Sequence, residues 1–294
     1  MQDYIDEFSS YLTTVKNSSE NTKASYLRDV QHYCDFLNQK KIQDPKNADQ
    51  KLISAYLKDL LSKGKSGATV LRTKASIKSF YSFLMQFGVI LINPATNVET
   101  SKPVQKMPQI LTSEEVDLLL SQPDTTDYKG IRDKAMLELL YATGIRVTEL
   151  LDLNIDDVNL EIGFVKCKNG RGQRIIPIYP SAVSALRAYL RQARAILLSD
   201  IAQPSLFVNI KGERMTRQGF FKIVKHYQEK AGIKKQITPH TLRHSFAMHL
   251  IQNGADLESV KEMMGHADIS STQVYARMIK QQISIVYSRC HPRA

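Results

Sequence analysis

The stretch TPHTLRHSFAMHL, residues 238–250, gathers side chains that can bind a metal ion or a phosphate. His240 and His244 are i, i+4 neighbours on a helix, a spacing that occurs in zinc sites. The residues between them include no carboxylate and one cation, Arg243, which would repel Zn²⁺. His240 and Arg243 share a helix face, where the planar guanidinium matches two phosphoryl oxygens and the imidazole adds a donor or a proton carrier. The spacing therefore favours a phosphate site without a metal, and a buried histidine beside a surface arginine is the alternative for this pair alone.

Two further segments supply residues that would complete such a site. TGIRVTEL places Arg146 just after Gly144, where the end of a helix would free the arginine to reach into a cleft. MGHADISSTQVYARM sets His266 in a Gly-His turn, followed by Tyr275. A tyrosine hydroxyl, with a pKa of about 10, attacks a phosphate only when a base or nearby cations activate it. Tyr275 is therefore a candidate nucleophile, with ordinary packing as the alternative.

The order Arg, His-x-x-Arg, Gly-His, Tyr resembles the catalytic set of the tyrosine recombinase (phage integrase) family, and within it the Xer recombinases. The resemblance extends over the whole chain. It implies a site-specific recombinase in which Arg146, His240, Arg243 and His266 act on a scissile phosphate and Tyr275 is the nucleophile. The product would be a covalent 3′-phosphotyrosine and a free 5′-hydroxyl. Because the phosphotyrosine retains the energy of the cleaved bond, no cofactor is expected, neither ATP nor Mg²⁺, and the sequence contains no P-loop pattern.

The segment GFVKCKNGRGQRIIPIYP, residues 163–180, alternates in polarity and contains Asn169-Gly170, a signal for a hairpin turn. The resemblance implies a general-acid lysine in a Gly-Lys-Gly turn between two strands, and this sequence lacks that tripeptide. Lysine can release a proton to the leaving 5′-oxygen, whereas arginine does so poorly. We therefore predict Lys168 as the general acid, with Lys166 and Arg171 as alternatives.

These residues need a scaffold, and the chain divides into a helical part and a mixed part. Residues 1–92 show helical spacing of apolar residues, and residues 93–110 have several prolines and no periodicity, as in an extended linker. Residues 111–294 combine the hairpin with further helices, which we expect at 181–199, 216–231, 240–253 and 256–264. We predict a mainly α fold with a small antiparallel β-sheet (α+β) in the catalytic domain. The resemblance implies that residues 1–92 form a SAM-like core-DNA-binding domain and that the two domains make a C-shaped clamp around DNA.

The composition points to a nucleic-acid partner. The 294 residues carry a formal net charge of +11, and 43% of them are hydrophobic, as is typical of a globular protein with a polyanionic partner. No acidic residue lies between residues 60 and 98, where the predicted DNA-binding residues Lys65, Arg72, Lys74 and Lys78 are found. A solvated charged face is the alternative.

Several features predict a cytoplasmic protein. The three cysteines are scattered, which is typical of a reducing compartment, and the acidic start of the chain does not resemble a signal peptide. No apolar run approaches the roughly 20 residues that cross a bilayer, so we expect no membrane insertion.

The resemblance also implies partners and a biological role. The expected substrate is double-stranded DNA, bound by a tetramer on two DNA sites that contains a second, XerC-like recombinase or copies of this chain. The expected role is resolution of chromosome dimers at a Xer-type site during cell division. After the nucleophile, Ile279, Ile283 and Val286 form an apolar stripe that is expected to dock on a neighbouring protomer, with packing on its own domain as the alternative. Other functions that use similar residues are those of a type IB topoisomerase, a mobile-element integrase and a non-catalytic DNA-binding regulator.

Overall fold

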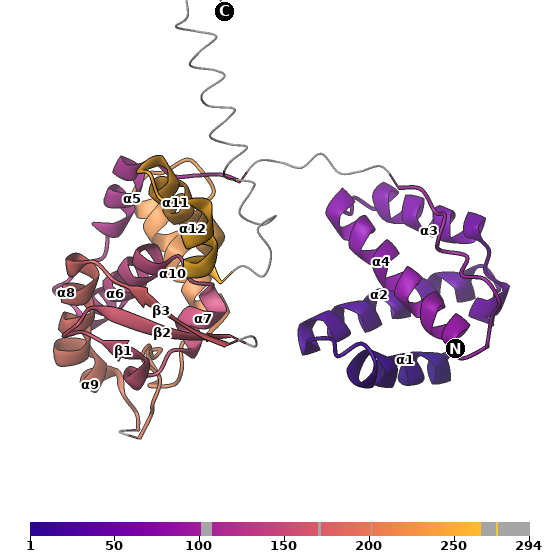
Figure 1. The fold of residues 1–294 in the computed structure, drawn as a ribbon, viewed down its shortest axis with the longest axis horizontal. Coiled ribbons are helices and arrows are strands. Elements are labelled where there is room, and N and C mark those ends of the chain that lie inside the picture. Colours follow the sequence, from indigo (N-terminus) through magenta and orange to yellow (C-terminus); the bar gives the residue numbers. More distant parts are fainter. Residues whose placement is uncertain (101–107, 170–171, 201, 266–274, 276–294) are drawn as a thin grey trace, which may run out of the picture. The chain divides into compact units, whose positions relative to one another are not determined.

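The computed structural model describes residues 1–100, 108–169, 172–200, 202–265 and 275 (Figure 1). The chain divides into two compact units, residues 1–105 and 106–294, so that the division falls within the segment predicted as a linker. The predicted linker begins too early, however. The Asn93 amide donates to the Lys78 carbonyl at 3.0 Å, and Ala95 and Val98 are buried in the core of the first unit. These residues follow the last helix of that unit and pack back onto it.

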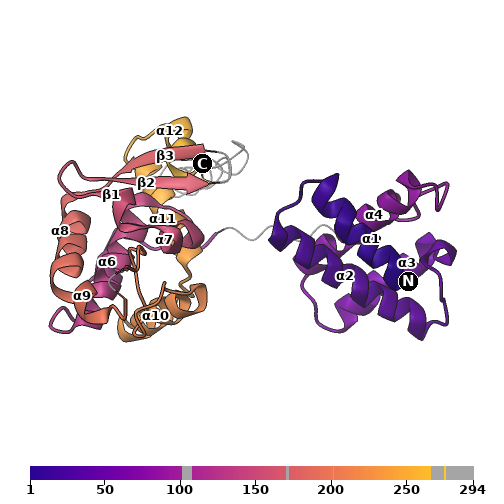
Figure 2. The same cartoon turned by 90° about the horizontal axis from the view of Figure 1, so that it is seen from below.

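The first unit is helical in its described residues, as the sequence predicts (Figure 2). Side-chain caps explain where three of its helices begin, because Ser19, Asp49 and Ser66 each accept a hydrogen bond from a backbone N–H in the first turn. Aromatic side chains fill the core, where the Phe8 and Phe80 rings meet edge to face at 5.4 Å. The elements are α1 (Gln2–Thr14), α2 (Glu20–Gln39), the 3-10 turn η1 (Pro45–Asn47), α3 (Gln50–Ser62) and α4 (Gly67–Gln86).

The second unit combines helices with a three-stranded antiparallel sheet of order β1-β2-β3. The strands are β1 (Val158–Asn159), β2 (Phe164–Asn169) and β3 (Gly172–Pro177). The ladder between β2 and β3 reaches the pair Asn169↔Gly172, so Asn169 belongs to the strand rather than to the turn to which the sequence pattern assigned it. The predicted class, mainly α with a small antiparallel sheet, is confirmed.

Helix α6 (Tyr128–Thr143) is the centre of this unit, because it is buried on nearly all sides and packs against α8 and α11 (Figure 1). The other elements surround it or the sheet: α5 (Ser113–Leu120), α7 (Val147–Asp152), the 3-10 turn η2 (Ile155–Asp157), α8 (Pro180–Ala188), the π-helical turn η3 (Tyr189–Ala193), α9 (Arg194–Leu197), α10 (Arg217–Lys230), α11 (Pro239–Gln252) and α12 (Leu257–Met264). The helices expected from residue 216 onward match α10, α11 and α12 closely. The helix expected over 181–199 is α8, η3 and α9 in succession.

No helix among the described residues has the length and apolar character needed to cross a membrane.

Candidate active site

Arg243 is a buried cation that joins two helix ends. It lies on α11, where Thr238 caps the helix and Pro239 occupies the first turn. Its side chain donates to the carbonyls of Gly144, at the end of α6, and of Met264, at the end of α12, the latter at 2.6 Å. Burial, together with the charge of Arg146, lowers the pKa of Arg243 to about 10, so the guanidinium remains protonated at neutral pH. The alternative of a surface arginine is wrong, because only 4% of Arg243 is exposed.

Arg146 lies beside Arg243 because of the turn that precedes it. Gly144 ends α6 in the left-handed conformation, with φ 56°, and a Cβ at this position would lie 2.1 Å from the Phe246 ring. The chain then enters α7 with Arg146 as its N-cap, and the Arg146 guanidinium donates to the Gly265 carbonyl at 3.0 Å. Its side chain is 40% exposed. Two neighbouring cations, one buried and one facing solvent, make this corner a site for an anion.

His240 is the exposed member of this group, one helical turn before Arg243. Partial desolvation and the positive charges of Arg243, Arg217 and Arg146 lower its pKa below the usual value for histidine. At neutral pH its imidazole is therefore uncharged, and it offers one donor and one acceptor.

Tyr275 has its side chain buried in a small apolar cluster with Phe246, Met248 and Val260. Its hydroxyl lies 2.7 Å from Nδ1 of His244. Burial raises the pKa of Tyr275 and the nearby Arg243 charge partly offsets this effect, so that the pKa lies at about 12. Burial, with the charges of His240 and Arg243, lowers the pKa of His244 to about 4. The imidazole is therefore neutral at pH 7, and it shares a hydrogen bond with the tyrosine hydroxyl, whose direction is set by the imidazole tautomer. In the described arrangement the tyrosine keeps its proton and is shielded from solvent.

Glu149 and Arg174 are two members of the site that the sequence analysis did not identify. They form a two-pronged ion pair at 2.8 and 3.0 Å, and the Arg174 Nε also donates to the Met263 carbonyl at 2.8 Å. Glu149 accepts the backbone N–H of Arg146 at 2.8 Å as well. Burial raises the pKa of Glu149, but the bonds from Arg174 and Arg146 outweigh burial and hold the pKa below its usual range. The spacing of Arg146 and Glu149 is that of a capping box, which is the one signal in the sequence that points to this carboxylate.

Lys168 does not join these residues in the described structure. Its side chain is 70% exposed and its ammonium lies 3.3 Å from Asp157 in η2. Lys168 and Lys166 lie on the face of β2 opposite the buried Cys167, and the Lys166 ammonium lies 5.9 Å from the centre of the Phe164 ring. Arg171 and His266, the remaining predicted residues of the site, lie outside the described part of the chain, as does the predicted apolar stripe of Ile279, Ile283 and Val286.

In the first unit, the predicted DNA-binding residues fall on and just before α4. Arg72 differs from the expectation, because it makes a two-pronged bond to Asp29 at 2.8 and 3.1 Å, and the Ser76 hydroxyl donates to the same carboxylate. Its charge is therefore largely offset by a buried aspartate. Lys65 and Lys78 are exposed, and Lys74 is half-buried.

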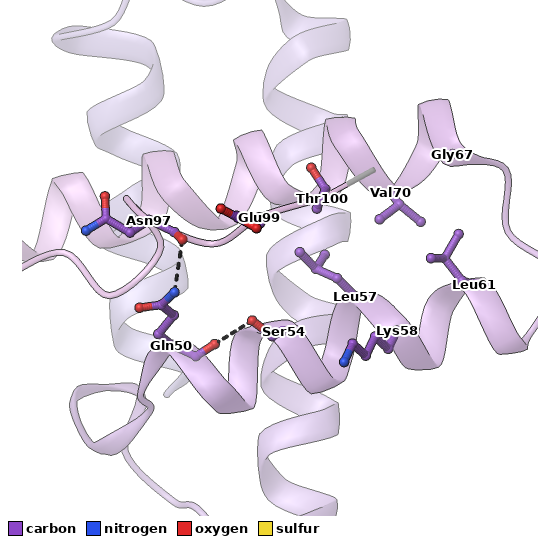
Figure 3. Close-up of a pocket in the computed structure, with 10 residues that line it drawn as sticks. All are labelled: Gln50, Ser54, Leu57, Lys58, Leu61, Gly67, Val70, Asn97, Glu99 and Thr100. Atoms are coloured by element: carbon purple, nitrogen blue, oxygen red, sulfur yellow. Dashed lines mark hydrogen bonds between the residues drawn. The ribbon is translucent and has the colours of Figure 1, made fainter. Parts of the chain in front are cut away.

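A groove of about 480 Å³ opens in the same unit between α3, the start of α4 and the segment after α4 (Figure 3). In the close-up, the Gln50 side chain reaches across to the Asn97 carbonyl at 2.9 Å. The floor consists of Leu57, Leu61 and Val70, and none of the predicted DNA-binding residues lines it. The groove is therefore separate from the predicted DNA-binding residues. In neither unit do the described residues contain a cluster of three His, Cys, Asp or Glu side chains that could hold a metal ion.

Comparison with known proteins decides the family. The model of the phage integrase family matches residues 109–282, and that of the phage integrase N-terminal SAM-like domain matches residues 5–88. The tyrosine recombinase XerD of Staphylococcus epidermidis is 42% identical over 295 residues, and that of Listeria innocua is 43% identical over 297, with the whole of each chain covered. The chain belongs to the phage integrase family. The resemblance found in the sequence motifs is confirmed, and so is the enzyme class: this chain is a site-specific tyrosine recombinase.

A solved structure also shares the fold of this recombinase. XerH, crystallised with a palindromic difH substrate as a post-cleavage complex, matches with a TM-score of 0.77 at 25% identity, over 98% of this chain and 89% of XerH. The alternatives of a topoisomerase and of a non-catalytic regulator gain no support from these relatives.

Proposed function

We propose that this recombinase cuts and rejoins double-stranded DNA at the site formed by Arg146, Arg243, His240 and Tyr275. One observation carries the proposal. The two arginines donate to the carbonyls of adjacent residues, Met264 and Gly265, and the charge of Arg243 acts on the phenol of Tyr275. A phosphate at this corner would meet two cations and a nucleophile, which is the set required for transesterification without a metal.

Each residue has a distinct role in this reaction. The Tyr275 oxygen attacks the phosphorus, the bond from phosphorus to the 5′-oxygen breaks, and a 3′-phosphotyrosine forms. Arg146 and Arg243 hold the two non-bridging oxygens, and His240 and His266 donate hydrogen bonds or accept the proton of the tyrosine. Lys168 gives a proton to the departing 5′-oxygen, with Lys166 or Arg171 as the alternative donor.

Two contacts of the described structure must open before this reaction. The Tyr275 hydroxyl has to leave His244, and Lys168 has to leave Asp157. A neutral hydrogen bond contributes about 0.5–1.5 kcal/mol net, and an exposed ion pair about 0.2–1 kcal/mol. These amounts are small beside a chemical barrier, so the contacts describe a resting arrangement that DNA binding can overcome.

The wider role that we propose follows from the relatives. Residues 1–92 bind DNA through Lys65, Lys74 and Lys78, with a smaller contribution from Arg72, and close with residues 111–294 around the duplex. Four subunits assemble on two sites, with a XerC-like chain or with copies of this one, and resolve chromosome dimers in the cytoplasm. Relatives called XerD that match over the full length support this role. Recombination at mobile-element ends but not at a chromosomal Xer-type site would indicate an integrase instead.

The test is trapping of the covalent intermediate on a nicked suicide substrate that carries a Xer-type site. We expect wild type to form an adduct and Tyr275→Phe to form none, with nearly unchanged affinity for the DNA. Tyr141→Phe is a matched control, because the Tyr141 hydroxyl also bonds to a histidine, His249, at 2.8 Å and is not part of the proposed site. Loss of the adduct in both variants, or its persistence in Tyr275→Phe, would contradict the assignment.

A further inference from the structure

Three arginines from three different elements hold three consecutive backbone carbonyls. Arg174 on β3 donates to Met263, Arg243 on α11 donates to Met264, and Arg146 at the start of α7 donates to Gly265. The carbonyls belong to the end of α12, where the last acceptors of a helix lack partners within the helix. This end of α12 is therefore the common support of both proposed phosphate-binding arginines, and Arg174 is its third contact.

Arg174 itself has no surface to offer a phosphate. Its side chain is 10% exposed, its Nε is bonded to Met263, and both terminal nitrogens are bonded to Glu149. The guanidinium also lies against Gly265, where a Cβ would be 2.8 Å from the Arg174 Cζ. Gly265 has φ 62°, so both the backbone conformation and the nearness of Arg174 favour glycine at this position.

The distances around Glu149 show what Arg174 does. The carboxylate lies 2.8 and 3.0 Å from Arg174, but 3.5 Å from the Arg146 guanidinium. Glu149 is therefore paired mainly with the buried Arg174, and its ion pair with the half-exposed Arg146 is longer. Most of the positive charge of Arg146 is thus available to another anion. Without Arg174, the buried carboxylate would lack its main partner, and Arg146 is the nearest cation that could replace it.

We propose that Arg174 is a positioning residue of the recombinase, which holds Glu149 and the Met263 carbonyl so that Arg146 stays free to bind the scissile phosphate. This inference rests on the proposed function, in which Arg146 holds that phosphate. Arg174 touches no reacting atom, and its effect passes through Glu149 and through the end of α12.

Two measurements test this role with the full chain. The first is the cleavage rate at saturating suicide substrate, and the second is the rate at which phenylglyoxal, an arginine reagent, labels Arg146 in the absence of DNA. We expect Arg174→Met to slow cleavage about 10²-fold, which is the usual effect of a small displacement of a group that binds the substrate. We also expect slower labelling of Arg146, because Glu149 would then pair with Arg146. Adding Glu149→Gln removes the competing charge and keeps an acceptor for the Arg146 N–H. This double variant should recover at least about tenfold in cleavage and regain the labelling.

Arg214→Met is the matched control. Arg214 also donates to backbone carbonyls of this unit, those of Leu151 and Leu153, and it makes no bond to Arg146 or Glu149. Its loss should lower the melting temperature without slowing cleavage by the folded protein. Two results would overturn the proposal. One is equal slowing of cleavage in Arg214→Met and Arg174→Met. The other is a double variant that melts like wild type but cleaves no faster than Arg174→Met. If wild type forms no adduct, the proposed function fails, and unchanged labelling of Arg146 in Arg174→Met would by itself refute the role of Arg174.

Discussion

The burial of His244 should make the stability of the second unit depend on pH. Its Nδ1 lies in a hydrogen bond of 2.7 Å with the hydroxyl of buried Tyr275, and burial with the charges of His240 and Arg243 lowers its pKa to about 4. In the unfolded chain a histidine has a pKa of about 6.5. Between these two values the unfolded chain binds a proton that the folded chain does not bind. The free energy of unfolding therefore decreases as the pH falls through this window, and the loss is complete below about pH 4.

The size of the effect follows from the two pKa values. Each pKa unit corresponds to about 1.4 kcal/mol, so the whole window accounts for about 3 kcal/mol, and the interval from pH 7.5 to 5.0 for about 2 kcal/mol. Few carboxylates titrate in that interval. This amount is a large fraction of the 5–15 kcal/mol that is typical of a folded domain.

The assay is amide hydrogen exchange in α11, which reports the free energy of opening for this unit alone. Opening free energies at pH 7.5 and 5.0, corrected for the intrinsic exchange rate, are compared for wild type, His244→Asn and His226→Asn. The lowered pKa of His240 contributes equally to all three. We expect His244→Asn to lose about 2 kcal/mol less than wild type on acidification, and replacement of the exposed His226 to change nothing. The same acid loss in His244→Asn and wild type would refute the reasoning.

Three further predictions concern the hairpin, the turn before the site and the tail. Lys168→Ala should slow cleavage by about two to four decades, and a substrate with a 5′-bridging sulfur should rescue it. Asp157→Asn should leave the cleavage rate unchanged. A wild-type cleavage rate in Lys168→Ala would exclude Lys168 as the general acid. In urea titrations, Gly144→Ala should lower the free energy of unfolding by about 1–3 kcal/mol more than Gly232→Ala does. A Cβ at Gly144 would lie 2.1 Å from the Phe246 ring, whereas a Cβ at Gly232 would have no atom within 4 Å. Truncation after Lys280 should preserve binding to a half-site but abolish cooperative binding to a full site in a band-shift titration; unchanged cooperativity would place the tail in its own domain.

The sequence predicted the features that depend on local chemistry. Glycines and capping residues mark the helix ends, and the structure has Gly144 and Gly265 in the left-handed conformation where α6 and α12 stop. The i, i+3 spacing placed His240 and Arg243 one turn apart on a single helix, α11. These predictions succeed because each rests on residues within one or two turns of chain.

The features that the sequence did not predict depend on partners far along the chain. Asp29 offsets Arg72 from 43 residues away, and Glu149 meets Arg174 from 25 residues away. A run of basic residues gives no sign of a carboxylate on another helix, so charge counting overestimated the free charge of Arg72. His244 was considered as a metal ligand with His240, whereas its hydrogen-bond partner is Tyr275, 31 residues later. Only packing brings such pairs together.

The charge balance of the site suits a transition state better than a bound substrate. Arg146, Arg174 and Arg243 contribute three positive charges and Glu149 one negative charge, while the lowered pKa of His240 keeps it neutral at pH 7. The net charge of this group is therefore two positive units. A phosphodiester carries one negative charge, and a second develops as the tyrosine oxygen attacks. Because Arg243 is bonded to backbone carbonyls instead of to a carboxylate, its charge is not neutralised before DNA arrives. Electrostatic stabilisation then increases as the reaction proceeds, and an interaction that strengthens towards the transition state is the kind that raises the rate.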